Sequence, residues 1–148
     1  MPDNLHFLLM KCFHHSNKAI VQKNAALSLL PGQGKILECL AEEDGLLPKE
    51  LGRRCVIDKS TITSLLSKME QKGLIKRTQD SMDKRAVNIW LTDVGRAYSK
   101  KAIKNGQDVD RAILDVLSRH QREELKDILK TIDEAYEKIN TSGHGKKE

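Results

Sequence analysis

The stretch from Ile57 to Gly73 has both a helix start signal and a helix stop signal, so it predicts one complete short helix. Asp58 is a good N-cap, because its carboxylate can accept hydrogen bonds from the free backbone N–H groups of Ser60 and Thr61. Gly73 predicts the end of the helix, since glycine readily adopts the left-handed conformation found there. The apolar residues follow helical spacing and predict one buried face, made of Ile62, Leu65, Leu66 and Met69.

The opposite face of this helix is rich in hydroxyl groups and has no carboxylate. Its members are Ser60, Thr63, Ser64, Ser67, Lys68 and Gln71. Short hydroxyl side chains near a helix N-terminus allow a polyanion to approach closely, because the free N–H groups and the helix dipole favour phosphate. The alternative is an ordinary solvated helix face.

The positive charge of the chain is concentrated around this helix. Between Lys49 and Arg85, ten Lys and Arg residues stand against five Asp and Glu residues, so this segment accounts for the whole net charge of +5. A basic patch on an otherwise neutral chain is typical of a nucleic-acid-binding surface. We therefore expect double-stranded DNA as a partner.

Composition sets the fold class and limits the function. With 148 residues, 39% apolar and 3% aromatic, the chain predicts one mainly α-helical domain over residues 1–148 with an aliphatic core. It has no apolar run of membrane-spanning length and no cleavable signal pattern, which predicts a cytoplasmic protein without a membrane partner. The three cysteines, Cys12, Cys39 and Cys55, are odd in number and widely spaced, which is neither a disulfide framework nor a zinc pattern.

Nothing in the sequence predicts an enzyme or a cofactor. It contains no nucleophile elbow, no phosphate loop and no metal-ligand spacing. His14 and His15 are adjacent, and side chains of adjacent helical residues point about 100° apart, so they do not share one metal ion easily. We therefore predict no metal site.

The residues before and after the capped helix predict a winged helix-turn-helix. Pro48 suits the first turn of a helix over residues 49–54, which is separated from the capped helix by the three residues Cys55–Ile57. In such a pair the second helix enters a major groove of DNA. Residues 74–78 and 86–91 then alternate in the manner of two strands around a polar tip, which predicts a β-hairpin wing. We assign residues 31–92 to this DNA-binding core.

The two ends of the chain predict dimerisation helices. Residues 4–26 and 93–140 carry apolar stripes that exceed what one winged-helix core can cover, which favours a homodimer. Within the second region, Ser118 and Gln121 have capping-box spacing and predict the start of the last helix. A polar tail is expected from Thr141 onward.

Three motifs at this spacing resemble the signature of MarR-family transcriptional regulators. Gly73–Arg77 is similar to the family's G-L-x-x-R, Asp83–Arg85 to its wing D-x-R, and Leu91–Gly95 to its L-T-x-x-G. The expected order of helices matches the family along nearly the whole chain. The resemblance implies a homodimeric repressor on a pseudo-palindromic operator, in many relatives released by a small anionic or phenolic ligand or by an oxidant.

The resemblance also implies which residues contact DNA: Ser60, Thr61, Thr63, Ser64, Lys68, Arg77, Asp83, Lys84 and Arg85. Arg85 matches the wing arginine that enters the minor groove, and Asp83 matches the carboxylate that holds its guanidinium. A turn-forming role is the alternative for Asp83. Arg77 matches a residue at the base of the wing, where a structural ion pair and a phosphate contact are equal alternatives.

One position departs from the family. Many relatives carry an arginine where this chain has Ser64, and arginine is the commonest specific reader of guanine. A hydroxyl reads bases more weakly, so we expect more of the discrimination to come from DNA shape and backbone placement.

Two other functions are compatible with the same residues. The first is an oxidant sensor working through Cys12, although a bystander thiol is favoured for Cys12 and packing roles for the other two cysteines. The second is a winged-helix module for protein–protein contact, against which the basic face and the D-x-R tip argue. The sequence does not indicate which effector is bound.

Overall fold

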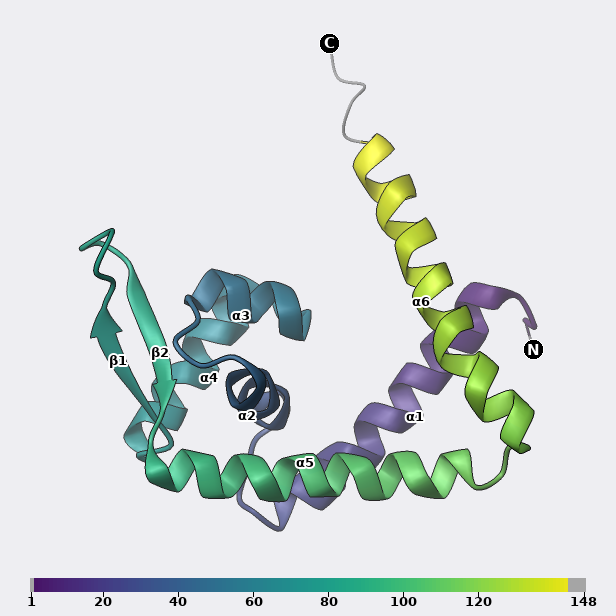
Figure 1. Cartoon of the computed structure of the whole chain (residues 1–148), viewed down its shortest axis with the longest axis horizontal. Coiled ribbons are helices and arrows are strands. Elements are labelled where there is room, and N and C mark those ends of the chain that lie inside the picture. The colour runs from purple at the N-terminus through teal and green to yellow at the C-terminus, as the bar shows by residue number, and fades with distance from the viewer. Residues whose placement is uncertain (1, 144–148) are drawn as a thin grey trace. The chain divides into compact units, whose positions relative to one another are not determined.

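The computed structural model describes residues 2–143 and consists of six helices and one two-stranded antiparallel sheet (Figure 1). In chain order the elements are α1 (Leu5–Ala25), α2 (Gln33–Glu42), α3 (Pro48–Cys55), α4 (Lys59–Gln71), β1 (Ile75–Gln79), β2 (Val87–Leu91), α5 (Asp93–Leu114) and α6 (Arg119–Ser142). The mainly helical winged helix-turn-helix predicted from the sequence is confirmed. The chain divides into two compact units, one ending at Val109 and the other beginning at Asp110. Within residues 2–143, no helix is long and apolar enough to cross a membrane.

The core of the first unit is aliphatic and lies among α2, α3, α4 and the hairpin. Its fully buried members include Ile36, Leu37, Leu40, Leu51, Leu66, Met69 and Ile89. The predicted apolar face of α4 is buried in full. The turn between α3 and α4 is shorter than predicted, because Cys55 belongs to α3 rather than to the turn. Val56 then reverses the chain with a left-handed φ of 55°.

The end of α4 is built as the sequence predicted. Gly73 has a φ of +72°, and its N–H donates to the carbonyl of Glu70 at 2.9 Å. The N–H of Leu74 donates to the carbonyl of Met69 at 2.9 Å. These bonds satisfy helix-end carbonyls and direct the chain into β1.

The hairpin pairs β1 with β2 in the register Ile75↔Leu91 to Gln79↔Val87. Leu46, in the loop before α3, forms a single bridge with β2, in which the N–H of Ile89 donates to the carbonyl of Leu46 at 2.9 Å. Gly45 has a φ of +74°, and a Cβ there would lie 2.5 Å from the Trp90 ring. Trp90 thus packs directly on the backbone before this bridge.

Helix α5 begins against the end of the preceding helix. The hydroxyl of Thr92 accepts from the N–H of Gly95 at 3.0 Å and donates to the carbonyl of Gly73. The carboxylate of Asp44 accepts from the N–H of Leu91 at 2.9 Å and pairs with Arg96 at 2.7 Å. The start of α5, the end of β2 and the loop after α2 are therefore joined by polar contacts.

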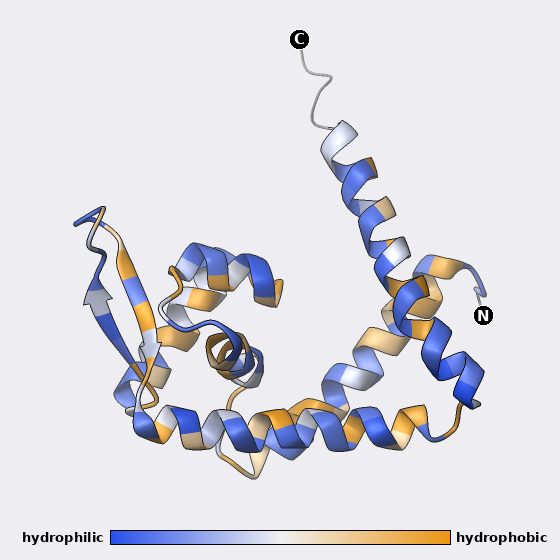
Figure 2. Cartoon of the chain, viewed as in Figure 1, coloured by the Kyte–Doolittle hydropathy of each residue, from blue (hydrophilic) through white to orange (hydrophobic). Residues whose placement is uncertain are grey.

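The second unit contains α6, whose capping box is confirmed. The hydroxyl of Ser118 accepts from the N–H of Gln121 at 3.2 Å, and the Gln121 side chain accepts from the N–H of Ser118 at 2.9 Å. The helix extends through Ser142, so Thr141 is helical rather than part of a tail. The rest of that predicted tail, residues 144–148, lies outside the described residues. Figure 2 shows hydrophobic segments spaced along α6.

Candidate nucleic-acid interface

The N-terminus of α4 is capped by Asp58 as predicted, although only one of the two expected backbone N–H groups, that of Thr61, donates to it. Its carboxylate accepts from the N–H of Thr61 at 2.9 Å and from the hydroxyls of Ser60 and Thr61 at 2.7 Å each. The contribution of Ser60 is therefore its hydroxyl, not its N–H. These bonds, the one from the Thr61 hydroxyl foremost, lower the pKa of Asp58 to about 2.

The hydroxyl face of α4 is exposed, and the hydroxyl hydrogens nearest its N-terminus are already used within the helix. Ser60 and Thr61 donate to Asp58, and Thr63 donates to the carbonyl of Lys59 at 2.8 Å. These three side chains present mainly lone pairs outward, which suits base-edge donors better than phosphate oxygens. Ser64 is exposed, and its hydroxyl has no hydrogen-bond partner among residues 2–143. Ser67, one turn further along this face, is exposed in the same way, so the hydroxyls of Ser64 and Ser67 can both donate and accept.

The Asp58 cap gives a prediction for stability against pH. A carboxyl group whose pKa is lowered on folding stabilises the fold above its unfolded pKa, and that contribution is lost as the pH falls through its folded pKa. For Asp58 this window runs from about 4 down to about 2. Asp58→Asn keeps the shape of the cap and removes the charge. We expect its melting temperature to lie below wild type at pH 6, with the gap closing as the pH approaches 2. A gap that is constant over this range in thermal melts would contradict this role.

The tip of the hairpin is shaped by carboxylates that accept backbone N–H groups. Asp80 accepts from Met82 at 2.8 Å and from Asp83 at 3.0 Å, and these bonds lower the pKa of Asp80. Asp83 accepts from the N–H of Arg85 at 2.9 Å. Asp80 was not identified from the sequence, although an Asp followed by Ser is a common turn opening.

Arg85 extends from this tip into solvent. Its side chain is 98% exposed, and its Nε lies 4.0 Å from the nearer carboxylate oxygen of Asp83. The shorter contact of Asp83 is with the Arg85 backbone, so its turn-forming role is the one with good hydrogen-bond geometry. The guanidinium remains available to a ligand. Lys84 is also exposed, and its carbonyl accepts from the Gln79 side chain at 2.8 Å.

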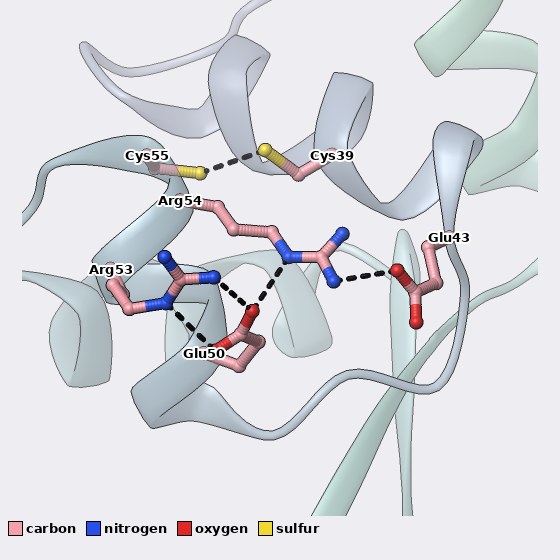
Figure 3. A network of polar contacts seen from close by, with 6 residues as sticks. All are labelled: Cys39, Glu43, Glu50, Arg53, Arg54 and Cys55. Carbon is pink, nitrogen blue, oxygen red and sulfur yellow. Dashed lines mark hydrogen bonds and ion pairs between the residues drawn. The ribbon is translucent and has the colours of Figure 1, made fainter. Parts of the chain in front are cut away.

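Several cations counted in the basic segment are paired with acids. Arg77 donates to Glu70 at 2.9 Å, which favours the structural ion pair over a phosphate contact. On α3, Arg53 and Arg54 contact Glu50 at 2.7 Å and 2.8 Å (Figure 3). These two contacts, that of Arg53 foremost, lower the pKa of Glu50 to about 2. The positive charge that α3 offers to a polyanion is therefore smaller than the sequence count indicates.

The structure also brings two cysteines into contact, for which the sequence predicted separate packing roles. Cys39 on α2 and Cys55 on α3 have their sulfur atoms 3.3 Å apart (Figure 3). Cys12 is exposed on α1. Within residues 2–143, no group of three or more His, Cys, Asp or Glu side chains could hold a metal ion.

A comparison with known protein families assigns the central part of the chain. A family model described as "MarR family" matches residues 29–87. These residues include α2, α3, α4 and β1 and end at the first residue of β2. The match therefore covers the helix-turn-helix and the tip of the hairpin.

Curated relatives are transcriptional regulators. The chain is 36% identical over 101 residues to TtmR of Methylorubrum extorquens, covering 68% of this chain and only 52% of TtmR. It is 30% identical over 118 residues to HosA of Escherichia coli, covering 76% of this chain and 87% of HosA. It is 32% identical over 128 residues to an organic hydroperoxide resistance transcriptional regulator of Bacillus subtilis, covering 86% and 84% of the two chains.

Solved structures share the fold. The Staphylococcus aureus MepR–DNA complex matches with a TM-score of 0.80 at 24% identity, covering 90% of this chain and 99% of MepR. A Mycobacterium tuberculosis MarR-family protein in complex with salicylic acid matches with a TM-score of 0.73 at 24% identity, covering 88% and 97%. The solved structures show the shared fold, and the family match and the curated relatives show that the chain belongs to the MarR family of transcriptional regulators.

Proposed function

We propose that this protein binds double-stranded DNA sequence-specifically as a homodimer and represses transcription from a pseudo-palindromic operator. The observation that carries the proposal is the exposed hydroxyl face of α4 together with the exposed Arg85 of the hairpin tip. In a winged helix-turn-helix, the first feature suits a major groove and the second a minor groove. The fold shared with the MepR–DNA complex supports this reading.

The direct test is selection of DNA from a random pool by the purified protein. We expect enrichment of an inverted repeat whose half-sites lie about 10 base pairs apart, centre to centre. Binding to the selected DNA should weaken steeply with rising salt, because phosphate contacts release counterions. No enriched sequence, or binding that ignores salt, would favour the winged-helix protein–protein module instead. Transcription from the selected site, with and without the protein, then separates repression from activation.

The dimer proposal rests on apolar side chains that the described residues leave exposed. On α1 these are Leu5, Leu8, Met10 and Phe13, and on α6 they are Ile128, Leu129, Tyr136 and Ile139. The α6 residues recur at helical spacing and form one stripe. A second copy of the chain that covered such stripes would remove apolar surface from water.

This proposal predicts that Ile128→Glu weakens the dimer. Ile128 is 52% exposed in one chain, so a glutamate there is tolerated by the monomer and is costly only when the stripe is covered. Lys130→Glu is the matched control, because residue 130 lies on another side of the same helix. Light scattering over a dilution series should give a higher dimer dissociation constant for Ile128→Glu than for Lys130→Glu. Equal dimer dissociation constants for the two variants would mean that the apolar stripe of α6 does not lie in the dimer interface.

A small effector is part of the proposal, by analogy with the relative solved with salicylic acid. We propose an anionic or phenolic compound that releases the protein from DNA. An oxidant sensed through Cys12 is the second candidate for the signal, and the hydroperoxide-resistance regulator among the relatives supports this candidate. Cys12→Ser tests this candidate, since only a redox role for Cys12 predicts an altered response to peroxide.

A further inference from the structure

Two cysteine side chains meet between the first two helices of the DNA-binding core. Cys39 lies on α2 and Cys55 on α3, 16 residues later, and their sulfur atoms are 3.3 Å apart (Figure 3). Cys55 is 5% exposed, whereas Cys39 is only half-buried. A disulfide bond is about 2.05 Å long, so the sulfurs need to approach by only about 1 Å more.

The surroundings favour one thiolate and one thiol. The hydrogen bond from Cys55 is the largest influence on Cys39 and lowers its pKa to about 7, assisted by the guanidinium of Arg54. Burial and the carboxylates of Glu38 and Glu42 oppose this effect. The same hydrogen bond raises the pKa of Cys55. A nucleophilic thiolate therefore faces a thiol that can resolve its oxidised form.

The half-buried thiol is open to small molecules. Cys39 lines a hollow of about 650 Å³, whose other walls include Phe13, Lys35, Arg54 and Val56. The hollow has apolar, cationic and acidic walls, the acidic ones from Glu38 and Glu42. Cys55 lines the same hollow but is the less exposed of the two thiols, so a small hydroperoxide that enters it meets Cys39 first.

We propose that Cys39 and Cys55 form a redox site that a hydroperoxide oxidises to an intramolecular disulfide. The Cys39 thiolate attacks one peroxide oxygen, the O–O bond breaks, and the leaving alkoxide takes a proton to become an alcohol. The Cys55 sulfur then attacks the sulfur of the Cys39 sulfenic acid. The hydroxide that leaves takes the Cys55 proton and departs as water. In sum, two thiols and one hydroperoxide give one disulfide, one alcohol and one water.

The position of Cys55 links this chemistry to DNA binding. Cys55 is the last residue of α3, and only Val56, Ile57 and the cap residue Asp58 separate it from α4. Its neighbour Arg54 is held by Glu43 at 2.6 Å and by Glu50 at 2.8 Å. Formation of the disulfide draws Cys55 toward α2 and displaces the turn between α3 and α4, which orients α4. The disulfide form therefore binds operator DNA less tightly. This last step rests on the proposed function.

The chemical test uses the full chain, reduced and then treated with cumene hydroperoxide at equimolar amount. We expect the free thiols to fall from three to one, with the mass of two hydrogen atoms lost and a peptide joined through Cys39 and Cys55. Dithiothreitol should restore three thiols. Cys12→Ser is the control and should form the same joined peptide. Unchanged thiols, or a disulfide that includes Cys12 or joins two chains, would overturn the proposal.

Two variants separate the roles of the two thiols. In Cys55→Ser the sulfenic acid at Cys39 should persist and be trapped by dimedone, whereas in Cys39→Ser oxidation should leave Cys55 reduced. Circular dichroism checks that each variant is folded, and the half-buried Cys39 is the site that tolerates substitution more readily. Trapping by dimedone at Cys55 in Cys39→Ser would reverse the assignment.

The effect of the disulfide on DNA binding is measured separately, by titrating reduced and oxidised protein against the DNA selected from the random pool. Oxidised wild type should bind several-fold more weakly than reduced wild type, and Cys39→Ser should bind equally before and after hydroperoxide. If the disulfide forms and binding stays unchanged, the link to α4 is wrong while the redox site stands. If reduced protein selects no DNA at all, the proposed function fails and the thiol result still decides the redox site.

Discussion

Replacing Gly95 with alanine should destabilise the protein more than the same replacement at any other helical glycine that the structure describes. A Cβ at this position would lie 1.9 Å from the backbone carbonyl oxygen of Leu74, at the point where the start of α5 packs on the beginning of the hairpin. A backbone atom cannot rotate away as a side chain can, so either α5 or the hairpin must move. Overpacking of this kind costs roughly 3 kcal/mol. The measurement is urea unfolding followed by circular dichroism.

Gly106→Ala is the matched control, because residue 106 lies in the same helix. The nearest atom to a Cβ there is the carboxylate oxygen of Glu38 at 3.5 Å, an ordinary contact. Alanine has a higher helix propensity than glycine by roughly 1 kcal/mol, so this variant should be as stable as wild type or more stable. If Gly95→Ala matched Gly106→Ala in its unfolding midpoint, α5 would not be held against Leu74 as described. The close contact also explains why a glycine stands in the L-T-x-x-G motif.

Replacing Arg85 with alanine should weaken operator binding more than replacing Ser64 with alanine. Arg85 offers a full charge on a side chain that is 98% exposed, and a narrow minor groove has a strongly negative potential. Ser64 offers one neutral hydroxyl, and a neutral hydrogen bond is worth roughly 1 kcal/mol net. Charge-assisted bonds are about twice as strong. The measurement is titration of each variant against one selected DNA at several salt concentrations.

The slope of affinity against salt separates the two roles. Arg85→Ala should flatten the slope by roughly one charge per subunit, since one groove cation is lost. Ser64→Ala should keep the slope and change which bases are preferred. A costlier Ser64→Ala, or an unchanged slope for Arg85→Ala, would mean that the wing is not the electrostatic anchor. Arg77→Ala is a useful comparison, because its ion pair with Glu70 predicts a smaller loss of slope.

The features that were predicted from sequence are those that neighbouring residues determine. The Asp58 cap, the reversal at Gly73 and the capping box at Ser118 each depend on residues within a few positions. Local patterns also predicted the hairpin and the buried face of α4, because both follow a fixed period. Their confirmation shows that local and global preferences agree in this chain.

The features that were not predicted depend on contacts between distant residues. The wide spacing of the cysteines along the chain gave no indication that Cys39 and Cys55 are in contact. Their sulfur atoms meet because α2 packs on α3. Counting charges overstated the free positive charge, because Arg54 is paired with Glu43, a residue outside the basic segment. The predicted start of the turn before α4 was wrong by one residue. Val56, not Cys55, adopts the left-handed conformation that ends α3, so α3 includes Cys55. Pairings of this kind leave no periodic trace in a sequence.

The packing of Trp90 on Gly45 has a practical consequence for optical work. Trp90 is the single tryptophan of the chain, and its indole N–H donates to the Thr78 hydroxyl across the hairpin at 2.8 Å. Its ring also rests on the backbone of Gly45, outside the hairpin. Emission excited selectively in tryptophan therefore comes from one indole at the base of the wing. Unlabelled protein carries a built-in fluorophore there, and a spectral shift on adding DNA, effector or oxidant can be assigned to that one location.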